Sequence, residues 1–181
     1  MKKTVVVYQS KYGSTKKYAE WIAQALSCDL AERRQMTGEK LAQYDVIIYG
    51  GGLYAGGVSG IDLIVKSFNR ICNKDIIVFT CGLADTSNAE NVEHIRKGLR
   101  SVFTEEMFAK IKLYHLRGGI DYGKLNILHK TMMAMLHKVM LKKDPASLSQ
   151  EDKEMLASYG KEVDFTDKRA IEPIVSFVCG Q

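Results

Sequence analysis

The stretch that decides the fold is Thr4-Val5-Val6-Val7-Tyr8-Gln9-Ser10-Lys11-Tyr12-Gly13-Ser14-Thr15. Its apolar, β-branched start is typical of a buried strand, and a helical pattern over residues 14–26 follows the hydroxyl-rich turn. Such a turn offers free backbone N–H groups, hydroxyl donors and the positive end of a helix dipole. Two interpretations stay open: the turn binds an anion, most often a phosphate, or Ser14 or Thr15 simply caps the helix.

Working outward from this stretch, short apolar segments alternate with helical patterns along the chain. The apolar segments predict strands at 3–8, 28–33, 46–49, 75–80 and 111–116. The helical patterns predict helices at 14–26, 61–72, 90–103, 124–142, 149–159 and 167–179. We expect a kink near Pro173 in the last of these helices. Alternation of this kind predicts parallel βαβ units with both sheet faces covered, and hence a doubly wound α/β fold. We expect one domain over residues 1–181, since neither an internal repeat nor a low-complexity linker divides the sequence.

Three of the predicted strands end in segments suited to a ligand. They are Ser10 to Thr15, then Gly50-Gly51-Gly52-Leu53-Tyr54-Ala55-Gly56-Gly57, and then Thr80-Cys81-Gly82-Leu83-Ala84-Asp85. The carboxyl ends of parallel strands meet at one edge of the sheet, where doubly wound folds bind their ligands. Glycines there let the backbone approach a ligand closely. Tyr54 either stacks on a flat ring or packs on its own loop.

Composition excludes several classes of function. The chain is 46% hydrophobic and 26% charged, with a formal net charge of +5, and it shows no nucleic-acid motif. No apolar run approaches the roughly 20 residues of a membrane span, and no signal peptide is evident, so we expect a cytoplasmic protein. The four cysteines form no CxxC pair and the four histidines no ligand cluster, so no metal site is expected. GxGxxG and GxxxxGK[ST] are absent, which argues against a dinucleotide site and an NTPase.

The turn after the first strand and the segment Tyr49-Gly50-Gly51-Gly52-Leu53-Tyr54-Ala55-Gly56 resemble the flavodoxin-like family, and the order of elements does so over nearly the whole chain. This resemblance implies a three-layer, doubly wound, five-stranded parallel sheet of order 2-1-3-4-5 that binds FMN. It implies that Ser10, Lys11, Tyr12, Gly13, Ser14 and Thr15 hold the phosphate, that Gly52, Leu53, Tyr54 and Ala55 lie against the flavin, and that Cys81, Gly82 and Leu83 form the other ring-contacting loop. No catalytic side chain is expected, because the flavin carries the redox chemistry.

Within this family the chain is most similar to the branch that includes flavodoxin-type protoporphyrinogen oxidases. The similarity rests on the turn Arg117-Gly118-Gly119-Ile120-Asp121-Tyr122, on the long basic, Met-rich helix after it, and on the positive net charge. It implies an FMN-dependent oxidoreductase acting on protoporphyrinogen or a quinone. The alternative is an FMN electron carrier that docks on partner redox proteins. Arg117 either meets an anionic substrate or pairs with a carboxylate, and Tyr122 shares this ambiguity.

The Met-rich helix leaves several interpretations open. Leu125, Leu128, Met132, Met135, Leu136 and Val139 share one face, while Met133, Met140 and Leu141 fall outside it. The simplest interpretation is a core-packing helix with a solvated basic side. The others are a platform for a small hydrophobic substrate, a homodimer contact, and peripheral contact with an anionic membrane.

Overall fold

A parallel sheet forms the centre of the protein in a computed structural model that describes residues 2–54 and 57–180. Its strands are β1 (Thr4–Gln9), β2 (Asp29–Glu32), β3 (Val46–Tyr54), β5 (Asp75–Gly82) and β6 (Lys112–Arg117), in the order β2-β1-β3-β5-β6. The two-residue strand β4 (Gly57–Val58) pairs antiparallel with β3, outside this path. Counted along the parallel strands alone, the order is the predicted 2-1-3-4-5, and the fold class is confirmed.

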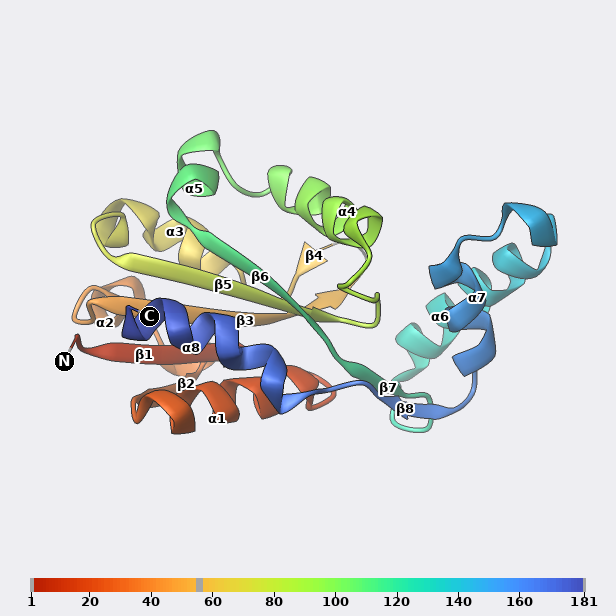
Figure 1. The fold of residues 1–181 in the computed structure, drawn as a ribbon, viewed down its shortest axis with the longest axis horizontal. Helices are drawn as coiled ribbons and strands as arrows, with labels where there is room; N and C mark the ends of the chain where they lie inside the picture. Colours follow the sequence, from red (N-terminus) through yellow and green to blue (C-terminus); the bar gives the residue numbers. More distant parts are fainter. Residues whose placement is uncertain (1, 55–56, 181) are drawn as a thin grey trace.

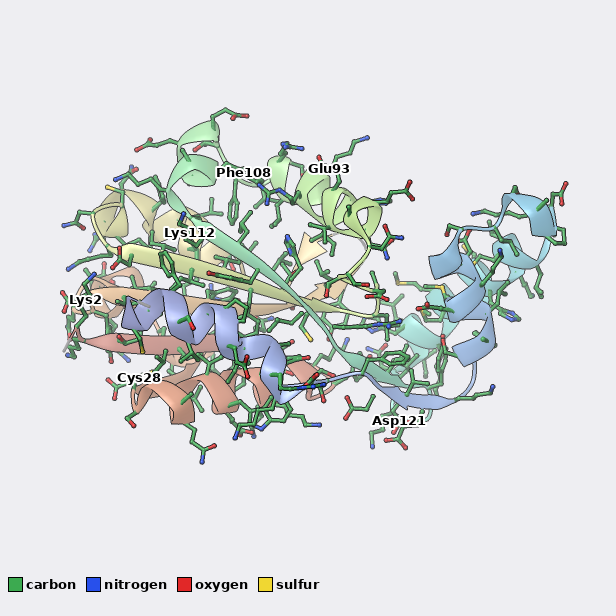
Figure 2. The ribbon with its side chains drawn as sticks, viewed as in Figure 1. Lys2, Cys28, Glu93, Phe108, Lys112 and Asp121 are labelled. Atoms are coloured by element: carbon green, nitrogen blue, oxygen red, sulfur yellow. The ribbon has the colours of Figure 1, made fainter. Side chains whose placement is uncertain are left out.

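Helices cover both faces of the sheet (Figure 1). Residues of α1 (Ser14–Leu26) and α8 (Glu172–Cys179) pack into one core cluster, and residues of α2 (Gly38–Leu41), α3 (Asp62–Ile71), α4 (Ala89–Arg100) and α5 (Glu105–Lys110) pack into the other. On the second face, the side chain of Phe108, a residue of α5, packs against the core cluster (Figure 2). Strand side chains alternate between the clusters, since Val5 and Val7 join one and Val6 and Tyr8 join the other. Burial on both faces explains why the strands read as continuous apolar runs.

The glycines after residue 49 lie inside β3, whereas the sequence places them in a loop beyond it. Gly50 pairs with Phe79 across β3 and β5, and a methyl group on Gly50 would overlap the Phe79 ring. At Gly52, an added Cβ would come within 2.8 Å of the Tyr54 ring. These two glycines therefore make room for aromatic rings, and the strand continues through them to Tyr54.

An arm of residues 119–164 extends beyond the carboxyl ends of the strands (Figure 1). It begins and ends in an antiparallel ribbon of β7 (Gly119–Asp121) and β8 (Glu162–Asp164), which the sequence pattern does not predict. Between them come α6 (Ile127–Leu141), the 3₁₀ turn η2 (Pro145–Ser147) and α7 (Gln150–Ser158). The two predicted helices of this region are therefore present, and they stand on a two-stranded stalk.

Two predictions about helices are wrong. The core-packing interpretation fails for the part of the stripe that lies in α6: Leu125, just before the helix, is buried, but Leu128, Met135 and Val139 are exposed, and within α6 the buried residue is Met140. The last helix is not kinked at Pro173, because the 3₁₀ turn η3 (Lys168–Ile171) comes first and Pro173 lies in the first turn of α8. Proline fits there since the first helical N–H groups have no intrahelical partner. Among the described residues, no helix has both the length and the apolar character to cross a membrane.

Candidate functional site

The turn between β1 and α1 leaves the start of α1 without a capping side chain. The N-cap residue is Gly13, with φ at +102°, a value that favours glycine. The first backbone hydrogen bond of the helix joins Lys17 N–H to the Gly13 carbonyl at 2.9 Å. The amides of residues 14–16 come before this bond and point out of the helix end, which is the arrangement that binds anions.

The hydroxyls of the turn have roles other than capping. Ser10 Oγ accepts the Gly13 N–H at 3.1 Å and so holds the turn in shape. Ser14 Oγ accepts the Gly119 N–H at 3.1 Å, and Thr15 hydrogen-bonds the Cys81 thiol. The capping interpretation of Ser14 and Thr15 is therefore wrong: these side chains connect the turn to β7 and to the end of β5.

A third chain segment closes this edge of the sheet. The Gly118 N–H donates to the Gly82 carbonyl at 2.6 Å, directly after β6. A side chain at Gly118 would lie 2.7 Å from Cys81 Sγ and 3.2 Å from Ser14 Cβ. Because residue 118 is a glycine, the backbone at the start of the arm packs directly against the turn and the end of β5.

A cleft opens between these strand ends and the arm. It is lined by Ser10, Tyr12, Ser14, Thr15, Leu53, Tyr54, Cys81, Gly82, Leu83, Gly118, Gly119, Ile120, Leu125, His129, Met132 and Met133. Nine of these were predicted from the sequence, and they come from all three predicted loops. Lys11 and Gly13 face a neighbouring depression on the β2 side, and Gly52 lies within β3. Ala55 falls outside the described residues.

The lining from the arm is the part that sequence reasoning missed. Gly118 and Gly119 were noticed only as a turn, and Leu125, His129 and Met133 were read as parts of a helix. No local pattern assigns them to the cleft, because only the path of the β7–β8 ribbon brings α6 back over the strand ends.

Three rings from three elements cluster at the cleft. Tyr12 and Tyr54 lie 6.0 Å apart between ring centroids, and His129 lies 5.5 Å from Tyr12 and 5.3 Å from Tyr54. His129 Nδ1 is 2.7 Å from the Tyr12 hydroxyl, and the Lys11 ammonium donates to Nε2 at 3.5 Å. An ammonium only donates, so Nε2 is the acceptor and Nδ1–H donates to Tyr12. Tyr54 thus packs against residues outside its own loop.

Burial keeps two groups of the cleft uncharged. It raises the pKa of the Tyr54 phenol to about 12, with the neighbouring Tyr12 as a smaller cause. It also raises the pKa of the Cys81 thiol to about 12. Both groups stay protonated at neutral pH, so Cys81 is not an activated nucleophile.

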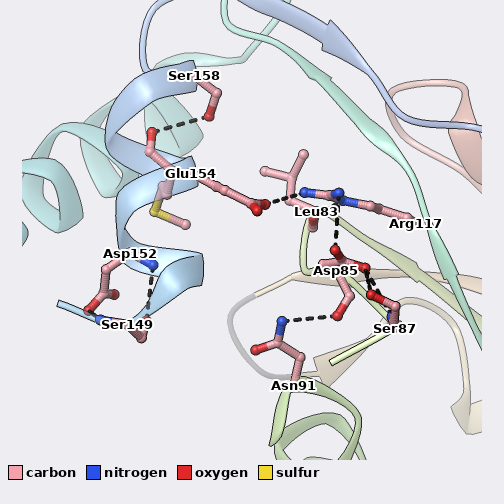
Figure 3. A network of polar contacts seen from close by, with 10 residues as sticks. Leu83, Asp85, Ser87, Asn91, Arg117, Ser149, Asp152, Glu154 and Ser158 are labelled. Atoms are coloured by element: carbon pink, nitrogen blue, oxygen red, sulfur yellow. Dashed lines mark hydrogen bonds and ion pairs between the residues drawn. The ribbon is translucent and has the colours of Figure 1, made fainter. Parts of the chain in front are cut away.

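Arg117, at the end of β6, pairs with carboxylates (Figure 3). Its guanidinium binds Glu154 of α7, lies 3.6 Å from Asp85 and donates from Nε to the Leu83 carbonyl at 3.0 Å. The same group lies 4.0 Å from the centroid of the Phe165 ring. Arg117 therefore joins the arm to the loop after β5. Of the two interpretations from the sequence, the structure supports pairing with carboxylates.

Tyr122 does not extend the site, and the described His, Cys, Asp and Glu side chains form no metal-binding group. Tyr122 is buried against Tyr159, with ring centroids 5.1 Å apart, and its hydroxyl has no hydrogen-bond partner among the described residues. Within residues 2–54 and 57–180, His, Cys, Asp and Glu side chains form no group of three that could hold a metal ion.

A second, wider groove of about 600 Å³ adjoins the cleft between α4 and the arm. Leu53, Gly82, Leu83 and Met133 line both spaces, so the two are continuous. The rest of the groove is lined by Ala84, Asn91, His94, Ile95, Lys97, Gly98, Ser101 and Met155. Its surface is largely apolar, and its lining includes one lysine, Lys97, and one histidine, His94.

The model of the flavodoxin domain family matches residues 5–147. The chain belongs to the flavodoxin family. This match spans more than half of the sequence and includes the turn, both predicted ring loops and most of the arm. Flavodoxins are FMN proteins, so the family supports the predicted cofactor. The site fits this cofactor, because the uncapped start of α1 suits a phosphate and the adjoining cleft has an apolar and aromatic lining.

Solved structures with a similar chain course include oxidised flavodoxin 2 from Bacillus cereus, at 17% identity and a TM-score of 0.42, covering 86% of this chain and 93% of that one. A flavoprotein in complex with FMN from Lactobacillus acidophilus is 17% identical, with a TM-score of 0.37 and coverage of 65% and 93%. Two-electron reduced flavodoxin from Megasphaera elsdenii is 14% identical, with a TM-score of 0.43 and coverage of 62% and 82%. No curated protein sequence matches the chain. The family assignment rests on the family model alone.

Proposed function

We propose that the protein is an FMN-dependent oxidoreductase whose cofactor binds in the cleft at the strand ends. The observation that carries the proposal is the uncapped start of α1 opening beside an apolar, aromatic cleft. Residues 10–15 hold the phosphate, with Gly52, Leu53, Tyr54 and Ala55 along one side of the ring and Cys81, Gly82 and Leu83 along the other. When bound, the flavin supplies the redox chemistry, and the protein supplies position and electrostatics.

The chain's own residues suit this role. Backbone amides at the start of α1 and the hydroxyl hydrogens of the turn are donors for an anionic phosphate. Tyr54 offers an uncharged aromatic ring, because burial raises its pKa to about 12. The other wall of the cleft carries no charge, because the Cys81 thiol stays protonated and Gly82 has no side chain. One-electron exchange needs no general acid or base from these side chains, and the protons released or taken up by a substrate or a quinone would be exchanged with solvent.

The groove beside the cleft favours an enzyme over a simple carrier. It is continuous with the cleft and largely apolar, and Lys97 stands on its α4 side. An apolar substrate suits such a surface, and protoporphyrinogen and a quinone are the substrates proposed for it; Lys97 would then meet the propionates of protoporphyrinogen. Met155 of α7 and Met133 of α6 bound the groove from the arm, and methionine adapts to irregular ligands.

The cofactor is tested by the visible spectrum of purified protein, which is expected to be that of a flavin, or to become so on addition of FMN. The double variant Ser10→Ala, Thr15→Ala is expected to bind FMN at least tenfold more weakly, since hydrogen bonds to charged groups contribute about 1.5–3 kcal/mol each. The matched control Ser147→Ala, Thr131→Ala removes two exposed hydroxyls outside both the cleft and the groove. Equal FMN affinity in both double variants would place the phosphate elsewhere.

The substrate is tested by steady-state oxidation of protoporphyrinogen with a quinone as acceptor. The variant Met155→Gln is expected to raise KM without changing FMN affinity, and Val102→Gln, on the outer surface after α4, serves as its control. A protein that binds FMN, is reduced by a partner reductase and turns over neither substrate would be the electron carrier of the alternative.

A further inference from the structure

The outer face of α6 carries a continuous apolar row that no residue described in the structure covers. The row consists of Leu128 (65% exposed), Met132 (41%), Met135 (65%), Leu136 (38%) and Val139 (51%). Their spacing over three turns puts them on one side of the helix. Single exposed apolar residues are ordinary on a protein surface, but a contiguous row marks a contact surface.

The row is not needed to hold the arm together. A different side of α6 makes the internal contacts, because His129 and Met133 line the cleft, Met140 is buried, and His137 stacks on Tyr159 at 3.9 Å between centroids. The apolar content of α6 therefore exceeds what its packing requires.

The charges around the row select among its possible occupants. Residues 124–143 contain five lysines and no aspartate or glutamate. Lys124 pairs with Asp121 at 2.7 Å and Lys143 with Asp152 at 2.9 Å. Of the remaining lysines, Lys138 and Lys142 flank the row, and the described part of the chain provides neither with an acidic partner within 4 Å. Two copies of the helix packed face to face would bring like charges together, whereas an anionic surface would neutralise them.

We propose that the α6 face is a peripheral docking surface for an anionic lipid bilayer. The helix lies in the plane of the headgroups, with its apolar row among the upper acyl chains and its lysines at the phosphates. This is the arrangement of interfacial amphipathic helices, which combine a buried apolar face with attraction to anionic lipid. The arm extends beyond the strand ends on its own stalk (Figure 1), and the exposed row of α6 is therefore displaced from the central sheet.

Docking would also place the lipid surface at the mouth of the cleft. Met132 belongs both to the exposed row and to the cleft lining. An apolar substrate dissolved in the bilayer would thus reach the site without crossing bulk water. This consequence rests on the proposed function, whereas docking itself does not.

The test is co-flotation of the FMN-loaded protein with vesicles of phosphatidylcholine, with and without phosphatidylglycerol. Binding is expected on the anionic vesicles, with weakening at high salt. The double variant Leu128→Gln, Met135→Gln should lower the partition coefficient roughly tenfold or more, through lost apolar burial. The double variant Lys138→Gln, Lys142→Gln should lower it roughly 30-fold on anionic vesicles, at about 1 kcal/mol for each lysine near the surface.

The matched control is Leu30→Gln, Val102→Gln, which removes two exposed apolar side chains outside the arm. An unchanged flavin spectrum shows that each variant keeps its fold and cleft. The proposal is overturned if wild type ignores anionic vesicles, or if the control loses as much binding as the α6 variants. It is also overturned if light scattering shows a dimer that the α6 substitutions dissociate while vesicles bind nothing. A colourless protein that still floats with vesicles would refute the FMN proposal and leave docking intact.

Discussion

Stability between pH 7.5 and pH 5 should depend on one histidine of the central sheet. His115 of β6 faces Thr80 of β5, with Nδ1 2.8 Å from the threonine Oγ1. The other ring nitrogen, Nε2, is buried and has no partner among the described residues. Burial, with a smaller contribution from Arg96, lowers the pKa of His115 from 6.5 to about 4. The folded protein therefore keeps this ring neutral in mild acid.

The sign follows from proton uptake by the unfolded chain. Above the unfolded pKa of 6.5, His115 is neutral in both states and folding is not opposed. As the pH falls below 6.5, the unfolded chain binds a proton that the folded chain refuses, until the folded pKa of about 4 is reached. At pH 5 this difference amounts to about 2 kcal/mol of unfolding free energy lost relative to pH 7.5.

Urea unfolding at about pH 7.5 and about pH 5 measures this loss, with the variant His115→Asn as the comparison. The asparagine amide does not titrate, and its oxygen lies near the position of Nδ1. The pH-dependent loss is expected to be about 2 kcal/mol smaller in the variant than in wild type. The control His94→Gln replaces an exposed histidine of α4 and should retain the wild-type loss. The same pH-dependent loss in His115→Asn and wild type would refute the reasoning, whatever the absolute stability of the variant.

Three further predictions concern packing, the arm and the cleft. Gly50→Ala should lower the unfolding free energy by about 3 kcal/mol, because the new methyl group overlaps Phe79, while Gly57→Ala, with only an ordinary contact at 3.7 Å, should be tolerated in the same melting experiment. Arg117→Met should speed amide hydrogen exchange in α7 by tenfold or more, since a charged hydrogen bond to the arm is lost; unchanged exchange would show that the arm is held otherwise. Cys81 should resist alkylation by iodoacetamide at pH 8 in the folded protein while the exposed Cys179 reacts, as followed by mass mapping of peptides, and prompt modification of Cys81 would contradict its raised pKa.

Local patterns were sufficient to predict the central sheet and the first helix. The run from Thr4 to Gln9 needs only its apolar, β-branched character to form a buried strand, and α1 begins and ends at Ser14 and Leu26 as its periodicity predicts. Where the structure differs from the sequence prediction, a neighbouring segment of the chain accounts for the difference. Gly50 continues β3 because the Phe79 ring fills its space, and Pro173 lies in the first turn of α8 because η3 ends directly before that helix.

The candidate site divides in the same way. Residues at the ends of strands that carry their own sequence signal, such as Ser10, Tyr54 and Cys81, were predicted and border one cleft. His129 was not, because it reaches the cleft only through the β7–β8 ribbon that carries the arm, and Gly118 was not, because its place depends on the hydrogen bond from its N–H to the Gly82 carbonyl.

Local patterns along the chain are enough to predict the alternation of strands and helices, the family, and the loops that meet at one sheet edge. Contacts between distant segments place the arm over these loops and leave the apolar row of α6 facing outward. The physical reason is that periodicity reports which residues share a side of a helix, whereas what that side meets depends on contacts between segments far apart in the chain. For α6 those contacts are made by His129 and Met140, which leaves the row from Leu128 to Val139 exposed.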